Sequence, residues 1–351
     1  MAPTEIQKIF KAGKIASQVR EYAKTIIKKD KLLLEIAEQI ENKIIELGGK
    51  PAFPTNLSIN EIAAHYTPSY DDKTLARGLL KVDLGVHIDG WIADTAFSID
   101  LEGNEKNKKL IKASEDALEK AIELVKEKIE VKKVNDKNIS SNDKLINKKR
   151  GDKVKGDELI NNKIRLGEQL QDVASKNRVE LGEGLTTSEI GKIIQQTIES
   201  QGFSPIVNLS GHSMEKYDLH SGITIPNINE KRTIEIKSGL YAIEPFATNG
   251  NGKIQDGKPS GIYIINQTKN VRSQLAREIL DFIAEEYKTI PFCSRWLVNK
   301  FGTKSLFAIR ELENNNIISQ FDQLVEISKK PVSQAEHTIL IDKDKVTVTT
   351  L

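Results

Sequence analysis

The chain has 351 residues, of which 38% are hydrophobic and 29% charged, and its formal net charge is +2. A chain of this length and apolar fraction is expected to form one large or two moderate globular domains. No stretch approaches the roughly 18 apolar residues of a membrane span, and the segment MAPTEIQKIF lacks the apolar core of a signal peptide. We therefore expect no membrane contact and a cytoplasmic location. The single cysteine, Cys293, excludes an internal disulfide, and its apolar and aromatic neighbours favour a buried thiol over a nucleophile.

Helical and strand patterns alternate along the chain and predict an α/β fold. The first 47 residues have apolar residues at helical spacing and predict two helices, the second of which ends at Gly48 and Gly49. The glycine-rich segment 247–261 lacks the spacing of a phosphate loop and is expected to be an ordinary loop. The other predicted elements are helices at about 108–128, from 187 onward and in three stretches after 270, and strands at 335–342 and 345–351.

The segment KVDLGVHIDGWIAD (81–94) predicts two short strands around a turn, yet it places an aspartate inside each strand. Aspartate is depleted in strands, so Asp83 and Asp94 need a compensating reason. Like charges that face each other on a sheet are destabilising unless a proton or a cation lies between them. A divalent metal ion is the favoured candidate, and a pair of solvated aspartates on an exposed face is the alternative.

Two registers of this hairpin are compatible with the sequence. A loop centred on 88–89 would make Asp83 and Asp94 direct cross-strand neighbours, whereas a tight turn at Asp89-Gly90 would place Asp94 opposite Gly85 and diagonal to Asp83. Because side chains alternate between the two faces of a strand, both registers put the two carboxylates on the same face. The prediction of a shared site does not depend on the choice.

Three further residues could complete such a site. His212 follows Gly211 in a polar loop, Glu244 ends an apolar strand pattern, and Glu336 stands immediately ahead of the strand HTILI. A carboxylate buried without a partner is costly, so Glu244 needs one. One imidazole and four carboxylates suit one or two divalent ions such as Mn, Co, Fe or Zn. The helical HExxH motif and the GxSxG elbow are absent from the sequence.

A basic segment interrupts the regular patterning. Residues 131–165 contain 11 Lys and Arg against 5 Asp and Glu and few large apolar residues. We interpret 131–182 as a basic, mobile insertion. It is either a solvated loop or an arm that contacts nucleic acid, in particular the ribosome. Nothing in the sequence predicts binding to a specific DNA.

Several segments resemble a known family in content and order. The chain is similar to methionine aminopeptidases of type 2, in their archaeal form, outside the 131–182 region. The matching segments are AAHYTP (63–68), KVDLGVHIDGWIADTAFS (81–98), NLSGHSMEKYDLHSGITIP (208–226), YAIEPFATNG (241–250), PFCSRWL (291–297) and AEHTILI (335–341). The resemblance implies an α/β pita-bread fold whose catalytic domain spans 1–265 and 333–351. It also implies a helical, winged-helix-like insertion subdomain at 266–332.

The resemblance further implies co-translational removal of the initiator methionine from nascent chains with a small second residue. A hydroxide that bridges two metal ions would attack the scissile carbonyl, and Glu244 would accept a proton from the attacking water. The metal ligands implied by position are Asp94 and Glu336 as bridges, Asp83 on one ion, and His212 with Glu244 on the other.

By the same resemblance, His65 and His220 contact the scissile amide and stabilise the tetrahedral intermediate, and Phe53 and Leu219 line the methionine pocket. His87 and His337 match no catalytic role. Two rival functions remain at this stage. One is a proline-specific dipeptidase or aminopeptidase on the same fold, and the other is a catalytically inactive relative that binds RNA or protein.

Overall fold

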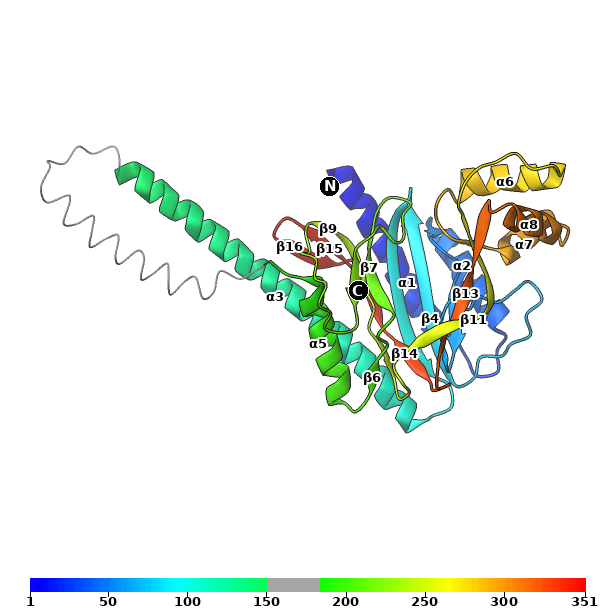
Figure 1. Cartoon of the computed structure of the whole chain (residues 1–351), viewed down its shortest axis with the longest axis horizontal. Coiled ribbons are helices and arrows are strands. Elements are labelled where there is room, and N and C mark those ends of the chain that lie inside the picture. The colour runs from blue at the N-terminus through cyan, green and yellow to red at the C-terminus, as the bar shows by residue number, and fades with distance from the viewer. Residues whose placement is uncertain (150–183) are drawn as a thin grey trace, which may run out of the picture.

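The computed structural model describes residues 1–149 and 184–351. Most of the predicted insertion at 131–182 therefore lies outside the described residues, and its mobility stays a prediction. The helix predicted at 108–128 is longer than expected, since α3 extends from Glu105 to Lys149 and its far end reaches beyond the sheet (Figure 1). The polar residues after 130 include no glycine or proline before Gly151, so nothing in the sequence breaks the helix earlier.

Most strands belong to one antiparallel sheet with the order β1-β4-β5-β15-β9-β7-β8, in which β2 also pairs with β4 and β16 with β15. The predicted C-terminal strands are thus β15 and β16. The sheet consists of β1 (Lys50–Pro51), β2 (Asn56–Ile59), β4 (Leu79–Ile88), β5 (Trp91–Asp100), β7 (Ser210–Met214), β8 (Thr224–Pro226), β9 (Gly239–Ile243), β15 (Glu336–Asp342) and β16 (Lys345–Val348).

Two smaller sheets border it, with the orders β14-β10-β6 and β12-β11-β13-β3. The segment expected to be a loop at 247–261 is mostly strand, which corrects that prediction. β11 bends at bulges around Pro259, and exposed polar residues in its first half hid the strand pattern. These sheets contain β3 (Ile62–Ala64), β6 (Ser204–Pro205), β10 (Phe246–Thr248), β11 (Ile254–Ile265), β12 (Phe292–Cys293), β13 (Ile318–Glu326) and β14 (Val332–Gln334).

Helices cover one face of the large sheet (Figure 1). The predicted N-terminal pair, α1 (Pro3–Ile26) and α2 (Leu33–Glu46), packs on the even-numbered residues of β4, such as Val82 and Leu84. Helices α3 and α5 (Thr187–Ser200) pack on odd-numbered residues of β9 and β15. Because neighbouring residues point to opposite faces, the odd residues of β4 and the even residues of β9 and β15 face away from the helices. The opposite face is therefore free to carry a site.

The register of the β4–β5 hairpin decides between the two predicted turns. Gly85 pairs with Asp94 and Asp83 with Ala96. The turn residues are Asp89 and Gly90, with φ of 49° and 88°, which is the left-handed conformation of a type I′ turn. The loop centred on 88–89 is wrong, and the Asp89-Gly90 turn is confirmed, as is the common face of the two aspartates.

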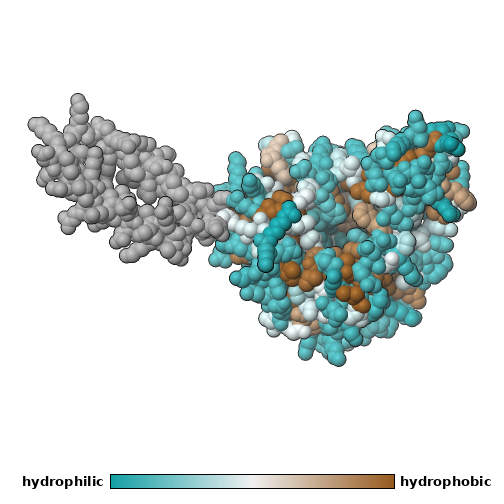
Figure 2. Space-filling view, viewed as in Figure 1, coloured by the Kyte–Doolittle hydropathy of each residue, from teal (hydrophilic) through white to brown (hydrophobic). Residues whose placement is uncertain are grey.

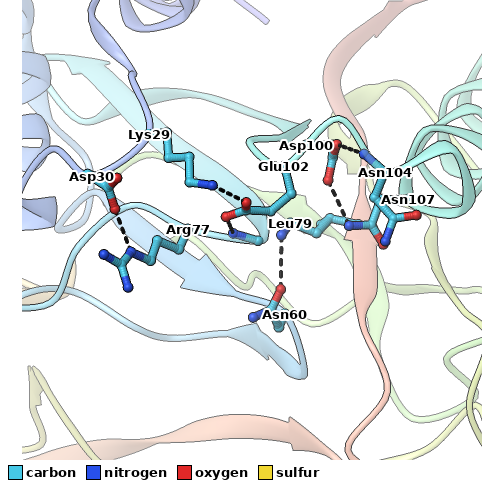
Figure 3. A network of polar contacts seen from close by, with 10 residues as sticks. Lys29, Asp30, Asn60, Arg77, Leu79, Asp100, Glu102, Asn104 and Asn107 are labelled. Atoms are coloured by element: carbon cyan, nitrogen blue, oxygen red, sulfur yellow. Dashed lines mark hydrogen bonds and ion pairs between the residues drawn. The ribbon is translucent and has the colours of Figure 1, made fainter.

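The open end of this hairpin is fixed by polar contacts (Figure 3). The Asn60 side chain accepts a hydrogen bond from the backbone N–H of Leu79 at 2.9 Å. Asp100 accepts hydrogen bonds from Asn104 N at 2.6 Å and from the Asn107 amide at 2.7 Å. Glu102 pairs with Lys29 of the loop after α1. These contacts tie both strands to α3 and to the N-terminal helices, so the position of the hairpin is set from outside the site.

The three helices predicted after residue 270 are present and lie together at one end of the molecule (Figure 1). They are α6 (Gln274–Glu286), α7 (Ser294–Phe301) and α8 (Ser305–Asn314). The strands β11 and β13 flank them in sequence and lie against each other. None of the helices in the described ranges combines the length and the apolar character that a bilayer crossing needs.

Candidate metal centre

Each of the five predicted ligand residues comes from a different strand of the large sheet, and these strands are neighbours. Asp83 lies on β4 and Asp94 on β5, Glu336 begins β15, Glu244 directly follows β9, and His212 lies on β7. The order β4-β5-β15-β9-β7 therefore places the five side chains in a row across the middle of the sheet. All five line one cavity of about 320 Å³.

Three of these side chains meet closely. One ligand atom from each of Asp94, His212 and Glu336 lies within 4.8 Å of the other two. The Nε2 atom of His212 is 3.8 Å from Asp94 Oδ2 and 3.6 Å from Glu244 Oε1. Asp94 is 3% exposed and Glu336 1%. The alternative of solvated aspartates on an exposed face is wrong for Asp94, because its carboxylate is buried among other acidic groups.

Burial and mutual repulsion shape the charges of the site. Burial raises the pKa of Asp83 to about 7. Burial, followed by the neighbouring carboxylates, raises the pKa values of Asp94 and Glu336 well above their ordinary range. For Glu244 the causes of the raised pKa are burial and the charge of Asp83. Burial lowers the pKa of His212 to about 3, so its imidazole is neutral near pH 7 and keeps a free lone pair.

The donor set fits divalent ions. One oxygen each of Asp83, Asp94 and Glu336, and Nδ1 of His212, are buried without a hydrogen-bond partner in the described part of the chain. Buried polar atoms are nearly always satisfied, so the unpartnered carboxylate oxygens of residues that line one cavity need a proton or a cation. The His212 atom that faces these carboxylates is Nε2. Carboxylate oxygens with one neutral imidazole suit Mn²⁺, Fe²⁺, Co²⁺ or Zn²⁺.

Sequence reasoning missed the residues that hold this row in place. The amide of Gln334 donates to Glu244 Oε2 at 3.2 Å and lies 3.5 Å from Glu336 Oε2. The hydroxyl of Thr338 accepts from Asp94 N and donates to Asp94 O, both at 2.8 Å. Gln334, Glu336 and Thr338 alternate along one segment and so share a face, but alternation alone does not single out Gln334 or Thr338 as supports of the site.

The two predicted histidines that are not ligands also line the cavity. Nδ1 of His65 lies 3.1 Å from the carbonyl oxygen of Asp322. Because a carbonyl oxygen only accepts, Nδ1 carries the proton and Nε2 keeps the lone pair of the neutral ring. Burial lowers the pKa of His65 to about 4. The rings of His220 and His212 meet edge to face with centroids 4.4 Å apart.

The apolar part of the cavity includes Phe53 and Leu219, which are 6% and 8% exposed. Phe53 lies against Gly85 of β4, where a Cβ atom would come within 2.3 Å of the phenyl ring. The absence of a side chain at Gly85 therefore lets Phe53 approach the sheet beside Asp83 and Asp94. Pro291 and Phe321 add further apolar surface to the lining.

The remaining candidates lie outside the cavity. His87 accepts a hydrogen bond from Gly90 N, and His337 contacts Arg20 and Thr350. Both histidines are thus bound within the protein. Cys293 is 1% exposed, and burial raises its pKa to about 12. The expectation of a buried thiol is confirmed.

Known proteins are similar to this chain over nearly its whole length. The sequence model of metallopeptidase family M24 matches residues 7–140. A methionine aminopeptidase of Pyrococcus horikoshii is 40% identical over 351 residues, covering 99% of both chains. One of Methanocaldococcus jannaschii is 41% identical over 347 residues, covering 98% of both chains. The chain belongs to the methionine aminopeptidases. The resemblance seen in the sequence is thereby confirmed.

Solved structures show the fold of this aminopeptidase family. A thermophilic Arx1 superposes with a TM-score of 0.74 at 15% identity, over 99% of this chain and 91% of that chain. The methionine aminopeptidase of Thermotoga maritima superposes with a TM-score of 0.60 at 19% identity, over 100% and 98%. At such identities the likeness shows the fold alone, which is the predicted pita-bread fold.

Proposed function

We propose that the chain removes the initiator methionine from nascent proteins whose second residue is small, by hydrolysis at a site for two divalent ions. One observation carries the proposal: five ligand residues from five adjacent strands converge, with unpartnered buried oxygens, beside an apolar pocket. In a member of the methionine aminopeptidases, this arrangement supports an active enzyme over an inactive relative.

The proposed ligands divide between the two ions as the resemblance implies. Asp94 and Glu336 would hold both ions, Asp83 would bind one, and His212 with Glu244 the other. Ions at these positions would polarise the scissile carbonyl and make a water molecule acidic enough to ionise near neutral pH.

A carboxylate, Glu244, and two imidazoles, His65 and His220, would take part in proton transfer and hydrogen bonding during the reaction. Glu244, whose Oε1 lies 3.6 Å from His212 Nε2, would take a proton from the attacking water and return it to the leaving amine. His65 presents an unprotonated Nε2, which suits it to accept a hydrogen bond from the scissile or the following peptide N–H. His220, next to His212, would stabilise the tetrahedral intermediate.

The apolar end of the cavity would select methionine. Phe53 and Leu219 would contact the side chain, since a flexible thioether packs well against aromatic and aliphatic walls. Such an enzyme would work in the cytoplasm, where nascent chains emerge. A ribosome contact through 131–165 stays a prediction, and deleting this segment should weaken salt-sensitive ribosome binding while peptide cleavage continues.

The test is release of free methionine from the peptide Met-Ala-Ser by metal-stripped protein, titrated with Mn²⁺ or Co²⁺. Activity should depend on metal and disappear in Asp94→Asn, whose side chain has nearly the same shape. An Xaa-Pro dipeptide is the matched control substrate, because faster turnover of that peptide would favour a proline-specific function. A folded protein that cleaves neither peptide with any metal would contradict the proposal.

A further inference from the structure

A buried ion pair joins α2 to α7. Glu41 of α2 and Arg295 of α7 are 5% and 1% exposed. The guanidinium donates to both carboxylate oxygens, from Nη1 to Oε2 at 2.7 Å and from Nη2 to Oε1 at 2.8 Å. The indole N–H of Trp296 donates to Glu41 Oε2 at 2.8 Å. The pair therefore joins the N-terminal helices to the helical segment 274–314 through a rigid, two-pronged contact.

The same two side chains hold the backbone of two other segments. Glu41 Oε1 accepts a hydrogen bond from Thr55 N at 3.1 Å, and Arg295 Nε donates to the carbonyl oxygen of Pro68 at 3.0 Å. The hydroxyl of Thr67 links these segments by donating to Thr55 O at 2.9 Å. The chain segments around 55 and 67 are thus tied to each other and to α7 at one point.

Each tied segment contributes a wall of the cavity. Phe53 lies two residues before Thr55, His65 two residues before Thr67, and Pro291 four residues before Arg295. All three line the cavity, whereas neither member of the ion pair is among the described residues that line it. A displacement at the ion pair would therefore move three walls together, although it lies outside the cavity.

Stability alone does not explain such a pair. Replacing a buried ion pair by apolar side chains of similar volume is often neutral or stabilising, because both charges lose their hydration on burial. What apolar side chains cannot supply is the directed contacts to Thr55 N and Pro68 O. The contacts of the pair therefore fix the positions of the backbone at Thr55 and Pro68.

We propose that the Glu41–Arg295 pair is a positioning element for substrate selection, which sets Phe53, His65 and Pro291 at the spacing that fits a methionine side chain. The inference rests on the proposed function, in which this cavity holds that side chain. The five ligand residues belong to the large sheet or its edge and make none of the contacts of this pair given above. Breaking the pair should therefore alter substrate fit and leave metal binding unchanged.

The test uses the full chain with Mn²⁺ and two variants. The double variant Glu41→Leu/Arg295→Met replaces the pair by apolar side chains and removes its contacts to Thr55 and Pro68. Thr67→Val is isosteric and removes a single hydroxyl. For the double variant we expect KM for Met-Ala-Ser to rise about tenfold with kcat within about threefold of wild type. The preference for methionine over leucine as first residue should fall by about the same factor. In Thr67→Val, KM should rise and the preference for methionine should fall, each by about threefold.

The matched control is the ion pair between Lys50 of β1 and Glu286 at the end of α6, which likewise joins two distant segments but is exposed. Lys50→Gln/Glu286→Gln should leave KM, kcat and the Mn²⁺ affinity, measured by calorimetry, at wild-type values. A folded double variant with wild-type KM and selectivity would overturn the inference. If the double variant does not fold, unchanged KM and selectivity in Thr67→Val overturn it. A wild-type protein without methionine release refutes the proposed function instead.

Discussion

Without metal, the carboxyl groups of the site are expected to destabilise the folded protein increasingly as the pH rises towards neutrality, because they are buried and face one another. Burial raises the pKa of Asp83 from 3.8 to about 7. Burial and neighbouring charges raise the pKa values of Asp94, Glu244 and Glu336 in the same direction. In the folded state these groups hold their protons more tightly than in the unfolded state.

The sign and size follow from proton linkage. A group whose folded pKa exceeds its unfolded pKa favours folding at low pH, and this contribution is lost as the pH rises through the folded value. One such group costs about 1.4 kcal/mol per pH unit between its two pKa values. For Asp83 alone, with a pKa raised to about 7, this is roughly 3 kcal/mol between pH 5 and pH 7. The other three carboxyl groups add to the loss.

The assay is urea unfolding of chelator-treated protein at a series of pH values. The buried histidines oppose this trend, since burial lowers the pKa of His212 to about 3 and that of His65 to about 4, and such groups add stability as the pH rises towards their unfolded pKa. The carboxyl contribution is therefore read as the difference from Asp83→Asn. Relative to that variant, the free energy of unfolding of wild type should fall by roughly 3 kcal/mol from pH 5 to pH 7, and Mn²⁺ should restore it at pH 7, because the ion binds only the folded site. Asp83→Asn cannot ionise at this position and keeps all the histidines, so it is the matched reference. A free energy of unfolding of metal-free wild type that does not fall relative to Asp83→Asn between these pH values would refute the reasoning.

Two substitutions test the supports of the site. Thr338→Val removes both hydrogen bonds to the Asp94 backbone. It should lower the free energy of unfolding by about 1–3 kcal/mol and weaken Mn²⁺ binding about 10–100-fold by calorimetry; wild-type values for both would contradict this. Gly85→Ala places a Cβ atom 2.3 Å from the Phe53 ring. It should push that ring into the pocket and lower kcat/KM for Met-Ala-Ser at least about tenfold, and full activity would show that Phe53 does not limit the pocket.

The sequence located the candidate ligands because their positions depend on local rules. Alternation along a strand puts Asp83 and Asp94 on one face in either register, so the prediction of a common face holds although one of the two turn positions is wrong. The positive φ at both turn residues, which glycine and aspartate tolerate, then selects the actual register. Burial, by contrast, depends on what packs around the hairpin. The sequence also offers His212, Glu244 and Glu336 as candidates, and the resemblance then assigns a role to each.

What sequence reasoning could not supply are contacts between segments far apart in the chain. Gln334 has no special pattern, and its amide matters only because β9 and β15 are neighbours. β11 was taken for a loop because its pairing with β13 tolerates bulges at glycine and proline. The pair Glu41 and Arg295 is separated by 254 residues, so only the fold shows that the two side chains meet.

The large sheet has two halves, one with β1, β2, β4 and β5 and the other with β7, β8, β9, β15 and β16, which meet at a seam between β5 and β15. Few backbone pairs cross this seam, so side chains support the site there. β5 and β15 share only two backbone pairs, Glu336 with Ala96 and His337 with Thr95. Side-chain hydroxyl groups add hydrogen bonds across the seam. Thr95 donates to Glu336 O at 2.9 Å, and Thr338 accepts from Asp94 N. Asp94 and Glu336 lie on opposite sides of this seam. Ions shared between them would hold the two halves together, so metal binding and the pairing of the halves should be coupled.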